Sequence, residues 1–251
     1  MTGGNETWRV WNNDDKVEAR TYQRVTGELP EMESTKQLVQ LVGEVYKPGM
    51  RVLDVGCAAG HYYNGLARLD PNLNYTGVDA TVKYIEFAKE HFKNNPNTRF
   101  IVGDIFNLPE AIGTFDIVFC CNVILHLPDF RVPFRNLLRA TMKHCFIRTL
   151  ISDKTYLNKF LYTDDFDANN NPVNFVHQNT YSFELLKSFV KESGAYQVEL
   201  IKDQFESENI NKEFTNYSGQ QSAVTKVVDG KQIAGNLIFE WQWLKITPQQ
   251  G

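Results

Sequence analysis

The segment Arg51–Gly60, which reads RVLDVGCAAG, constrains the fold of this chain more than any other stretch of the sequence. A short apolar run ends in the acid Asp54, and spaced glycines follow it. This order predicts a buried strand and then a tight turn in which backbone can approach a ligand, because glycine has no Cβ. The acid argues against a bound pyrophosphate and favours a ligand that carries a cation or hydroxyl groups.

Strand and helix signals alternate around this turn. Apolar runs predict strands, and residues with helical spacing predict the helices between them. The predicted strands are 51–55, 74–79, 98–103, 115–121 and 143–150, and the predicted helices are 32–46, 61–69, 81–93 and 130–141, with a short turn near 107–112. Such alternation predicts parallel strands with right-handed helical crossovers and a ligand site outside the carboxyl ends of the strands.

The second half of the chain has a different pattern. Residues 152–180 are rich in Asn, Asp and aromatic side chains, and they precede a predicted helix at 181–193 and a strand at 196–203. Asp229-Gly230 lies between two β-rich segments, 222–229 and 231–246, and such a dipeptide is a strong signal of a hairpin.

Together these elements predict an α/β fold. We expect a doubly wound, mostly parallel, seven-stranded sheet with an antiparallel last strand, enclosed in a three-layer sandwich. One domain would span 1–251, with an N-terminal cap and helix at 1–47 and insertions at 151–180 and 204–233. These added segments are expected to form the cap over a bound substrate.

Composition limits the functional classes. The hydrophobic content of 42% and charged content of 22% are ordinary for a protein with a buried core. The net charge of -4 disfavours a nucleic-acid substrate. The four cysteines form no CxxC pair, so no metal site is expected, and reduced thiols fit the cytoplasm. The N-terminus lacks the apolar core of a signal peptide, and no apolar run is long enough to span a bilayer.

Two further acids follow the next two predicted strands. Asp79 lies about 20 residues beyond the glycine turn, where an acid can accept hydrogen bonds from the hydroxyls of a ribose. The alternative is that Asp79 caps a helix. Asp104 could accept a hydrogen bond from an exocyclic amine such as N6 of adenine, and its alternative is a solvated loop acid. Three acids after three consecutive strands favour a shared ligand site.

The fourth strand leads into the sequence Asn122-Val-Ile-Leu-His126-Leu-Pro-Asp129. The strand brings Asn122 to the carboxyl edge of the sheet, and the following turn carries His126 and Asp129. A histidine at this place can act as a general base near neutral pH. The alternative is that His126 fixes the loop by a hydrogen bond.

These four segments, in this order and at these spacings, resemble class I (Rossmann-like) S-adenosylmethionine (SAM)-dependent methyltransferases. They are most similar to the bacterial small-molecule type, which has a V-L-D-V-G-C-G-x-G turn and an H-L-P-D loop. The resemblance covers about residues 36–150 and weakens beyond them. It implies SAM as the cofactor and S-adenosylhomocysteine (SAH) as its product.

The resemblance also implies roles for particular residues. Asp54 and the backbone of the glycine turn would hold the methionine part, Asp79 the ribose, and Asn122 would line the cofactor near the sulfonium. Ala58 stands where the family usually has glycine, and it is tolerable there if its φ is negative. The implied cofactor-binding residues are Asp54, Gly56, Cys57, Ala58, Gly60, Asp79, Ala80, Asp104, Ile105 and Asn122, with Asp104 and Ile105 at the adenine.

The expected reaction is methyl transfer from SAM to an oxygen or nitrogen of a small-molecule acceptor. His126 is the predicted catalytic base, and Tyr22 and His177 are further candidates at the acceptor, while His61 and Tyr62 are expected to pack near the cofactor. The chain is expected to act as a monomer or homodimer, without nucleic acid or membrane as partner.

Two other functions stay open at this point. A non-catalytic SAM-binding module would bind the cofactor without turning over an acceptor. An NAD-dependent oxidoreductase on a related fold is disfavoured because the fingerprint G-x-G-x-x-G is absent. The sequence also lacks Asp/Asn-Pro-Pro-Tyr/Phe, Pro-Cys and a three-cysteine cluster, which argues against amino-directed nucleic-acid methyltransferases, cytosine-C5 methyltransferases and radical SAM enzymes.

Overall fold

A computed structural model describes residues 15–108, 112–194, 196–204, 226–228, 231–234 and 237–249. Its helices are α1 (Asp15–Thr26), α2 (Glu33–Gly43), α3 (His61–Leu66), α4 (Val82–His91), α5 (Arg131–Ala140) and α6 (Phe183–Glu192), with a 3-10 turn η3 (Ile124–His126). The main sheet contains β1 (Arg51–Val55), β2 (Asn74–Asp79), β3 (Thr98–Val102), β4 (Phe115–Cys121), β5 (Thr141–Ser152), β8 (Tyr181–Ser182), β9 (Tyr196–Lys202) and β13 (Trp241–Pro248).

The sheet confirms the predicted fold class. Its strands follow the order β3-β2-β1-β4-β5-β13-β9, and the pairs from β3 to β5 are all parallel. The last strand, β13, is antiparallel to both of its neighbours, β5 and β9. The short strand β8 pairs in parallel with the end of β5, in addition to the seven strands that were predicted.

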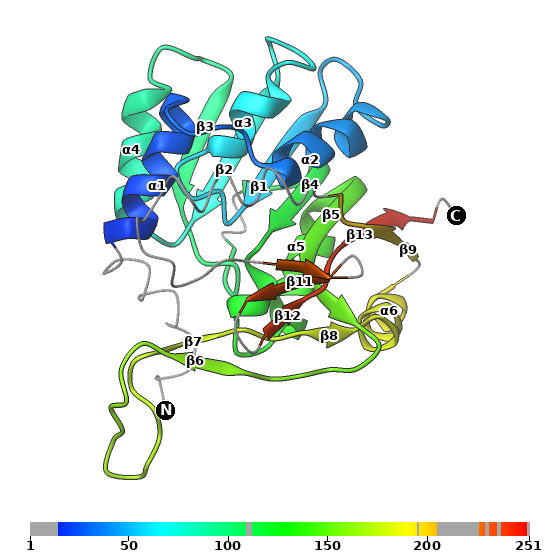
Figure 1. The fold of residues 1–251 in the computed structure, drawn as a ribbon. Helices are drawn as coiled ribbons and strands as arrows, with labels where there is room; N and C mark the ends of the chain where they lie inside the picture. The colour runs from blue at the N-terminus through cyan, green and yellow to red at the C-terminus, as the bar shows by residue number, and fades with distance from the viewer. Residues whose placement is uncertain are drawn as a thin grey trace.

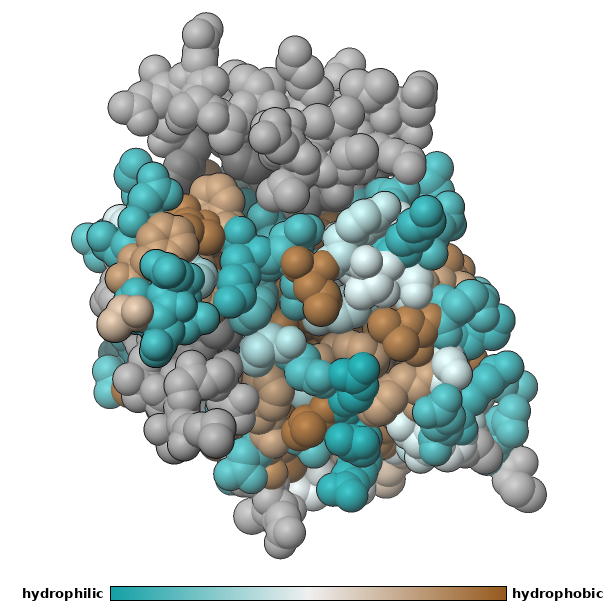
Figure 2. Space-filling view, turned by 90° about the horizontal axis from the view of Figure 1, so that it is seen from below, coloured by the Kyte–Doolittle hydropathy of each residue, from teal (hydrophilic) through white to brown (hydrophobic). Residues whose placement is uncertain are grey.

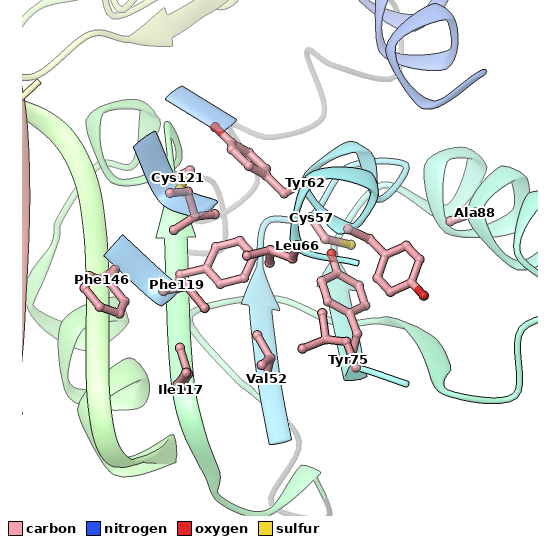
Figure 3. Close-up of a cluster of buried hydrophobic side chains, with 14 of the residues drawn as sticks. Val52, Cys57, Tyr62, Leu66, Tyr75, Ala88, Ile117, Phe119, Cys121 and Phe146 are labelled. Carbon is pink, nitrogen blue, oxygen red and sulfur yellow. The ribbon is translucent and has the colours of Figure 1, made fainter. Parts of the chain in front are cut away.

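Helices cover both faces of this sheet and make the three layers (Figure 1). Side chains of α2, α3 and α4 pack against one face with Val52, Ile117 and Phe119, and Figure 3 shows these three strand residues in that cluster. The alternate residues of the same strands, such as Leu53 and Val118, pack against α5 and α6 on the other face. Continuous apolar runs in β1 and β4 are therefore explained by burial on both faces.

Several predicted boundaries need correction. The predicted helix 61–69 ends at Leu66, and the strand predicted at 143–150 extends over Thr141–Ser152. The segment 231–246 is not one strand but three, namely β11 (Lys231–Ala234), β12 (Leu237–Phe239) and β13, of which only β13 joins the main sheet. Strand β10 (Lys226–Val228) pairs antiparallel with β11, which confirms the hairpin, although Asp229-Gly230 and residues 205–225 lie outside the described residues.

Three elements of the added segments were not predicted. Helix α1 forms within the N-terminal part, where the sequence shows little apolar periodicity and only Val25 is buried. Strands β6 (Lys159–Leu161) and β7 (Phe175–His177) form an antiparallel pair within the insertion 151–180. Figure 1 shows that the chain between β6 and β7 extends away from the sheet.

The surface of the insertion carries large apolar side chains. Leu157 is 70% exposed, and Tyr156, Phe160, Phe166 and Val173 are also exposed. Figure 2, which looks from below Figure 1, shows hydrophobic surface broken by hydrophilic side chains. No helix within the described ranges combines the length and apolar character needed to cross a membrane.

A substitution of Gly77, in the middle of β2, tests how closely the turn after β1 packs on the sheet. A Cβ there would lie 2.8 Å from Cys57 Sγ and 2.9 Å from Phe100 Cδ1. We expect Gly77→Ala to lower the free energy of unfolding by about 1–3 kcal/mol, because a close-packed core has no room for the methyl group. Urea denaturation measures the change. Gly43→Ala is the control, since its nearest atom is the flexible Leu69 Cδ2 at 3.3 Å, and an equal loss in both variants would contradict the packing argument.

Candidate functional site

A cavity of about 340 Å³ lies where β1, β2, β3 and β4 end, and α1 contributes one side of it. Its position is that expected for a ligand site in a parallel α/β sheet. The strand ends and the loops after them contribute Val55, Gly56, Ala58, His61, Tyr62, Asp79, Ala80, Thr81, Tyr84, Gly103, Asp104, Ile105, Cys121, Asn122, Val123, His126 and Leu127. The N-terminal part contributes Val17, Arg20, Thr21, Arg24 and Met32.

The turn after β1 is tied to the end of β2. The backbone N–H groups of Gly56 and Cys57 both donate to the Val78 carbonyl, at 2.7 and 3.1 Å. Gly56 has a φ of +81°, and a Cβ on it would lie 2.2 Å from Val123 Cγ2. Glycine is therefore required at Gly56 both for the left-handed backbone and for the close approach of the loop after β4.

Ala58 corrects an expectation from the sequence. Its φ is +47°, in the left-handed region, whereas alanine was expected there only with a negative φ. The conformation places the Ala58 N–H against Asp79 Oδ2 at 2.9 Å. A left-handed backbone costs an alanine roughly 1–2 kcal/mol, so this hydrogen bond and the packing of the turn hold a strained residue in place.

Asp79, which the sequence analysis places at a ribose, lines the cavity. Its Oδ1 accepts from the Thr81 N–H at 2.8 Å, and the N-cap of α4 is Thr81 rather than Asp79. Burial raises the pKa of the Asp79 carboxyl, and the hydrogen bonds from Thr81 and Ala58 oppose this shift. Because each carboxylate oxygen can accept a second hydrogen bond, Asp79 retains capacity for ligand hydroxyls.

Asp54 lies behind the cavity wall rather than in it. It is fully buried, and the Tyr75 hydroxyl donates to its Oδ2 at 2.6 Å. Its Oδ1 has no hydrogen-bond partner among the described residues, and burial raises the pKa of the Asp54 carboxyl well above its ordinary value. Cys57 and Gly60 are also absent from the lining, so only Gly56 and Ala58 of the predicted turn residues reach the cavity.

The candidate site residues after β3 and β4 lie at the cavity. Asp104, Ile105 and Asn122 all line it, and Asp104 Oδ1 accepts from the Phe106 N–H at 2.9 Å. Asn122 has a φ of +61°, a conformation that asparagine tolerates better than most residues. The Asn122 side chain is held by Arg148, whose Nη1 donates to Asn122 Oδ1 at 2.6 Å.

His126, at the end of η3, also lines the cavity. Its Nδ1 lies 2.8 Å from the carbonyl oxygen of His177, and a carbonyl only accepts, so Nδ1 carries the proton. The Nε2 atom then holds the lone pair of the ring. Burial lowers the pKa of His126 to about 4, which keeps the imidazole neutral at physiological pH. His126 can therefore fix the loop through Nδ1 and still have Nε2 as a possible proton acceptor.

The two other acceptor candidates do not line the cavity. Tyr22 packs against α4, where its ring stacks on Phe87 at 4.0 Å between ring centroids and its hydroxyl lies 3.5 Å from the Lys83 carbonyl oxygen. His177 contributes its carbonyl group to His126 rather than its ring. The structure therefore gives each of these two residues a supporting contact instead of a place in the cavity.

Four residues of α1 line the cavity and were not predicted from the sequence. These residues are separated by three, one and three positions, a spacing that places them on one face of a helix. They are Val17, Arg20, Thr21 and Arg24. This spacing is the feature of the sequence that could have indicated a helix here. Three of the four residues are polar, so they form no apolar stripe. His61 also lines the cavity, its Nδ1 has no hydrogen-bond partner among the described residues, and burial lowers its pKa to about 3.

The chemistry of the lining fits an adenosyl ligand better than a metal ion. Asp79 offers acceptors for hydroxyl groups, Gly56 leaves room for close backbone contact, and His61 Nδ1 has no hydrogen-bond partner among the described residues. Within the described part of the chain, no group of three His, Cys, Asp or Glu side chains could hold a metal ion.

Comparisons with known proteins agree with this geometry. The sequence model of the family described as methyltransferase domain matches residues 46–246. Phosphoethanolamine N-methyltransferase 3 of Arabidopsis thaliana is 34% identical over 119 residues, which cover 45% of this chain and 24% of that protein. The mitochondrial ubiquinone biosynthesis O-methyltransferase of Saccharomyces cerevisiae is 32% identical over 103 residues, covering 41% of this chain and 30% of that protein. The matched region is thus about a quarter of the length of these relatives.

Among solved structures, a SAM-dependent methyltransferase from Clostridium acetobutylicum superposes with a TM-score of 0.57. The match covers 92% of this chain and 98% of that one at 15% sequence identity. A likeness at this identity establishes a shared fold.

The strained backbone of Ala58 gives a direct test of the turn. We expect Ala58→Gly to keep or raise the free energy of unfolding by up to about 1 kcal/mol, because glycine adopts a positive φ without a steric penalty. Thermal unfolding measures this. In α4, by contrast, Ala88→Gly should destabilise by about 1 kcal/mol or more. A similar loss in both variants would show that Ala58 is not strained.

The two half-buried histidines of the cavity should titrate abnormally. In the folded protein we expect the NMR shifts of the His126 and His61 rings to stay constant from pH 8 to about 5.5, because their pKa values are about 4 and about 3. The same rings in urea should titrate near 6.5. Since folding lowers both pKa values, their contribution to stability is complete above about pH 6.5 and is lost as the pH falls toward 4. A folded-state midpoint near 6.5 for His126 would contradict its burial.

Proposed function

Because this chain belongs to the methyltransferase domain family, we propose that it is an SAM-dependent methyltransferase acting on an oxygen or nitrogen of a small molecule. The observation that carries the proposal is one cavity lined by the glycine turn, Asp79, Asp104, Asn122 and His126 together. Its volume of about 340 Å³ is in the range of small-molecule sites. We further propose a single domain over 1–251, in which the N-terminal part and the insertions 151–180 and 204–233 serve the acceptor.

The proposed cofactor contacts follow the strand ends. Asp79, with the neighbouring Ala80, would hold the ribose hydroxyls, and Asp104 and Ile105 would contact the adenine. The turn at Gly56 and Ala58 would lie along the methionine part. Asp54, Cys57 and Gly60 would support this turn from behind, since none of the three lines the cavity.

The chemistry of the proposed reaction requires positioning more than activation. Bound SAM supplies a methyl group on a sulfonium, which is already reactive toward a nucleophile. The chain has to align the acceptor with that methyl group and exclude water, and both effects lower the barrier substantially. Helix α1 contributes to both, because it forms one side of the cavity.

His126 is the proposed base for a hydroxyl acceptor. Its neutral ring, oriented by the His177 carbonyl, presents the Nε2 lone pair. A pKa of about 4 makes the ring a weak proton acceptor toward a free hydroxyl. Methylation strongly acidifies the acceptor oxygen, so the proton would move to Nε2 as the new bond forms. An amine that arrives neutral would need this residue less.

The α1 face brings two guanidinium groups to the cavity. Arg20 and Arg24 both line the cavity, and Arg24 contributes to the lowered pKa of His61 after burial, which places its charge near that ring. A guanidinium suits carboxylate and phosphate groups because its donors form a planar fork. The four free, buried cysteines agree with a proposed cytoplasmic setting, and a monomer or homodimer stays the prediction for assembly.

Calorimetry with SAH, SAM and NAD tests the proposal. We expect SAH and SAM to bind and NAD to fail, and Asp79→Asn to weaken SAH binding by about tenfold, because charge-assisted hydrogen bonds to the ribose are lost. Asp116→Asn is the matched control, since Asp116 pairs with Lys143 at the start of β4, away from the cavity. Binding of NAD without SAH would refute the function, and binding of SAM without methyl transfer to any acceptor would favour the non-catalytic module.

A further inference from the structure

A buried ion pair lies directly behind the cavity wall. Arg148 in β5 and Asp203 after β9 have side chains that are 8% and 1% exposed. Arg148 Nε donates to Asp203 Oδ1 and Nη2 donates to Oδ2, both at 2.7 Å. This bidentate geometry uses both oxygens of the carboxylate, and it leaves the Nη1 group of Arg148 for a third partner.

That third partner is Asn122, a residue of the cavity lining. Arg148 Nη1 donates to Asn122 Oδ1 at 2.6 Å, and the Asn122 backbone N–H donates to the Arg148 carbonyl at 3.0 Å. Arginine has donors only, so the atom that faces it must be the amide oxygen and not the amide nitrogen. The orientation of the Asn122 amide is therefore fixed by chemistry as well as by position.

Other groups fix Arg148 and Asp203 in turn. Trp243 Nε1 donates to Asp203 Oδ1 and to Gln37 Oε1, each at 2.9 Å. The Arg148 guanidinium also stacks over the Trp241 ring, with its carbon 4.2 Å from the ring centroid. Burial would lower the pKa of Arg148, but the Asp203 carboxylate outweighs that effect and raises it, so the guanidinium stays charged.

We propose that Arg148 is a positioning residue that orients Asn122 as a hydrogen-bond donor toward the cavity. Because its oxygen is directed to the buried Arg148, Asn122 offers its two amide N–H groups to a ligand. The ligand atom opposite Asn122 is then a hydrogen-bond acceptor, such as a hydroxyl, ether or carboxylate oxygen. The proposal rests on the proposed function for the ligands that would supply this atom, namely the cofactor or the methyl acceptor.

Asn122→Asp isolates the donor. The new side chain keeps an oxygen for Arg148 and tolerates a positive φ, but it replaces the N–H donors with a second acceptor. SAH is the suitable probe, because its neutral thioether gives the added carboxylate no sulfonium to attract. Asn170→Asp is the matched control, since Asn170 is exposed and has a similar φ of +58°.

With both variants folded, we expect calorimetry to show unchanged SAH binding in Asn170→Asp. In Asn122→Asp, SAH binding should be at least tenfold weaker when the acceptor atom belongs to the cofactor. In the wild-type protein, the Asn122 side-chain amide signals, assigned with the Asp variant, should shift on SAH addition and be slow to exchange. Arg148→Lys should remove the slow exchange while the fold persists, because one ammonium cannot hold both Asp203 and Asn122. A merely structural role of Arg148 would leave these amide signals unchanged.

The source of the ligand atom is read from the same signals. A shift with SAH alone assigns the acceptor atom to the cofactor, and a shift only when malonate or phosphate is added to the SAH complex assigns it to the methyl acceptor. Unshifted signals under both conditions, together with equal SAH affinity in Asn122→Asp, would overturn the proposal. Failure of the wild-type protein to bind SAH would instead contradict the proposed function.

Discussion

The site depends on the hydrogen bonds that tie the turn after β1 to the end of β2. The Val78 carbonyl accepts from both Gly56 and Cys57, and the Asp79 carboxylate accepts from Ala58. These bonds form only because β1 and β2 are parallel neighbours in a register that pairs Val55 with Val78. The parallel sheet therefore does more than bring loop residues to one edge, since it folds one loop onto the next and leaves the cavity beside them.

The same arrangement explains why the acid that ends β1 is not a lining residue. In a strand, successive side chains point to opposite faces, and Asp54 points into the layer where Tyr75 and Cys57 pack. Tyr75 satisfies one oxygen of the carboxyl, and the other has no partner among the described residues. Burying the Asp54 carboxyl costs free energy. We therefore expect Asp54 to support the turn that lies over it.

The sequence was sufficient to predict the sheet, and also that Asp79, Asp104, Asn122 and His126 would meet. That inference needs only the strand positions, because the carboxyl ends of parallel strands lie at one edge. Other features require coordinates. The φ of Ala58 is set by packing of the turn, and α1 lacks the apolar stripe that reveals a helix in sequence. Arg148 and Asp203 are 55 positions apart, so no local pattern could have paired them.

The antiparallel last strand has a consequence for the site because of where it is inserted. Strand β13 lies between β5 and β9, and its register sets Trp243 opposite Arg148 on one side and Ile201 on the other. The Trp243 indole can thus reach Asp203 just beyond β9, while Trp241 stacks on the guanidinium. Removal of β13 from this place would separate Arg148 from the groups that hold it, and Asn122 would lose its fixed orientation. The C-terminal half of the chain therefore supports the cavity from behind.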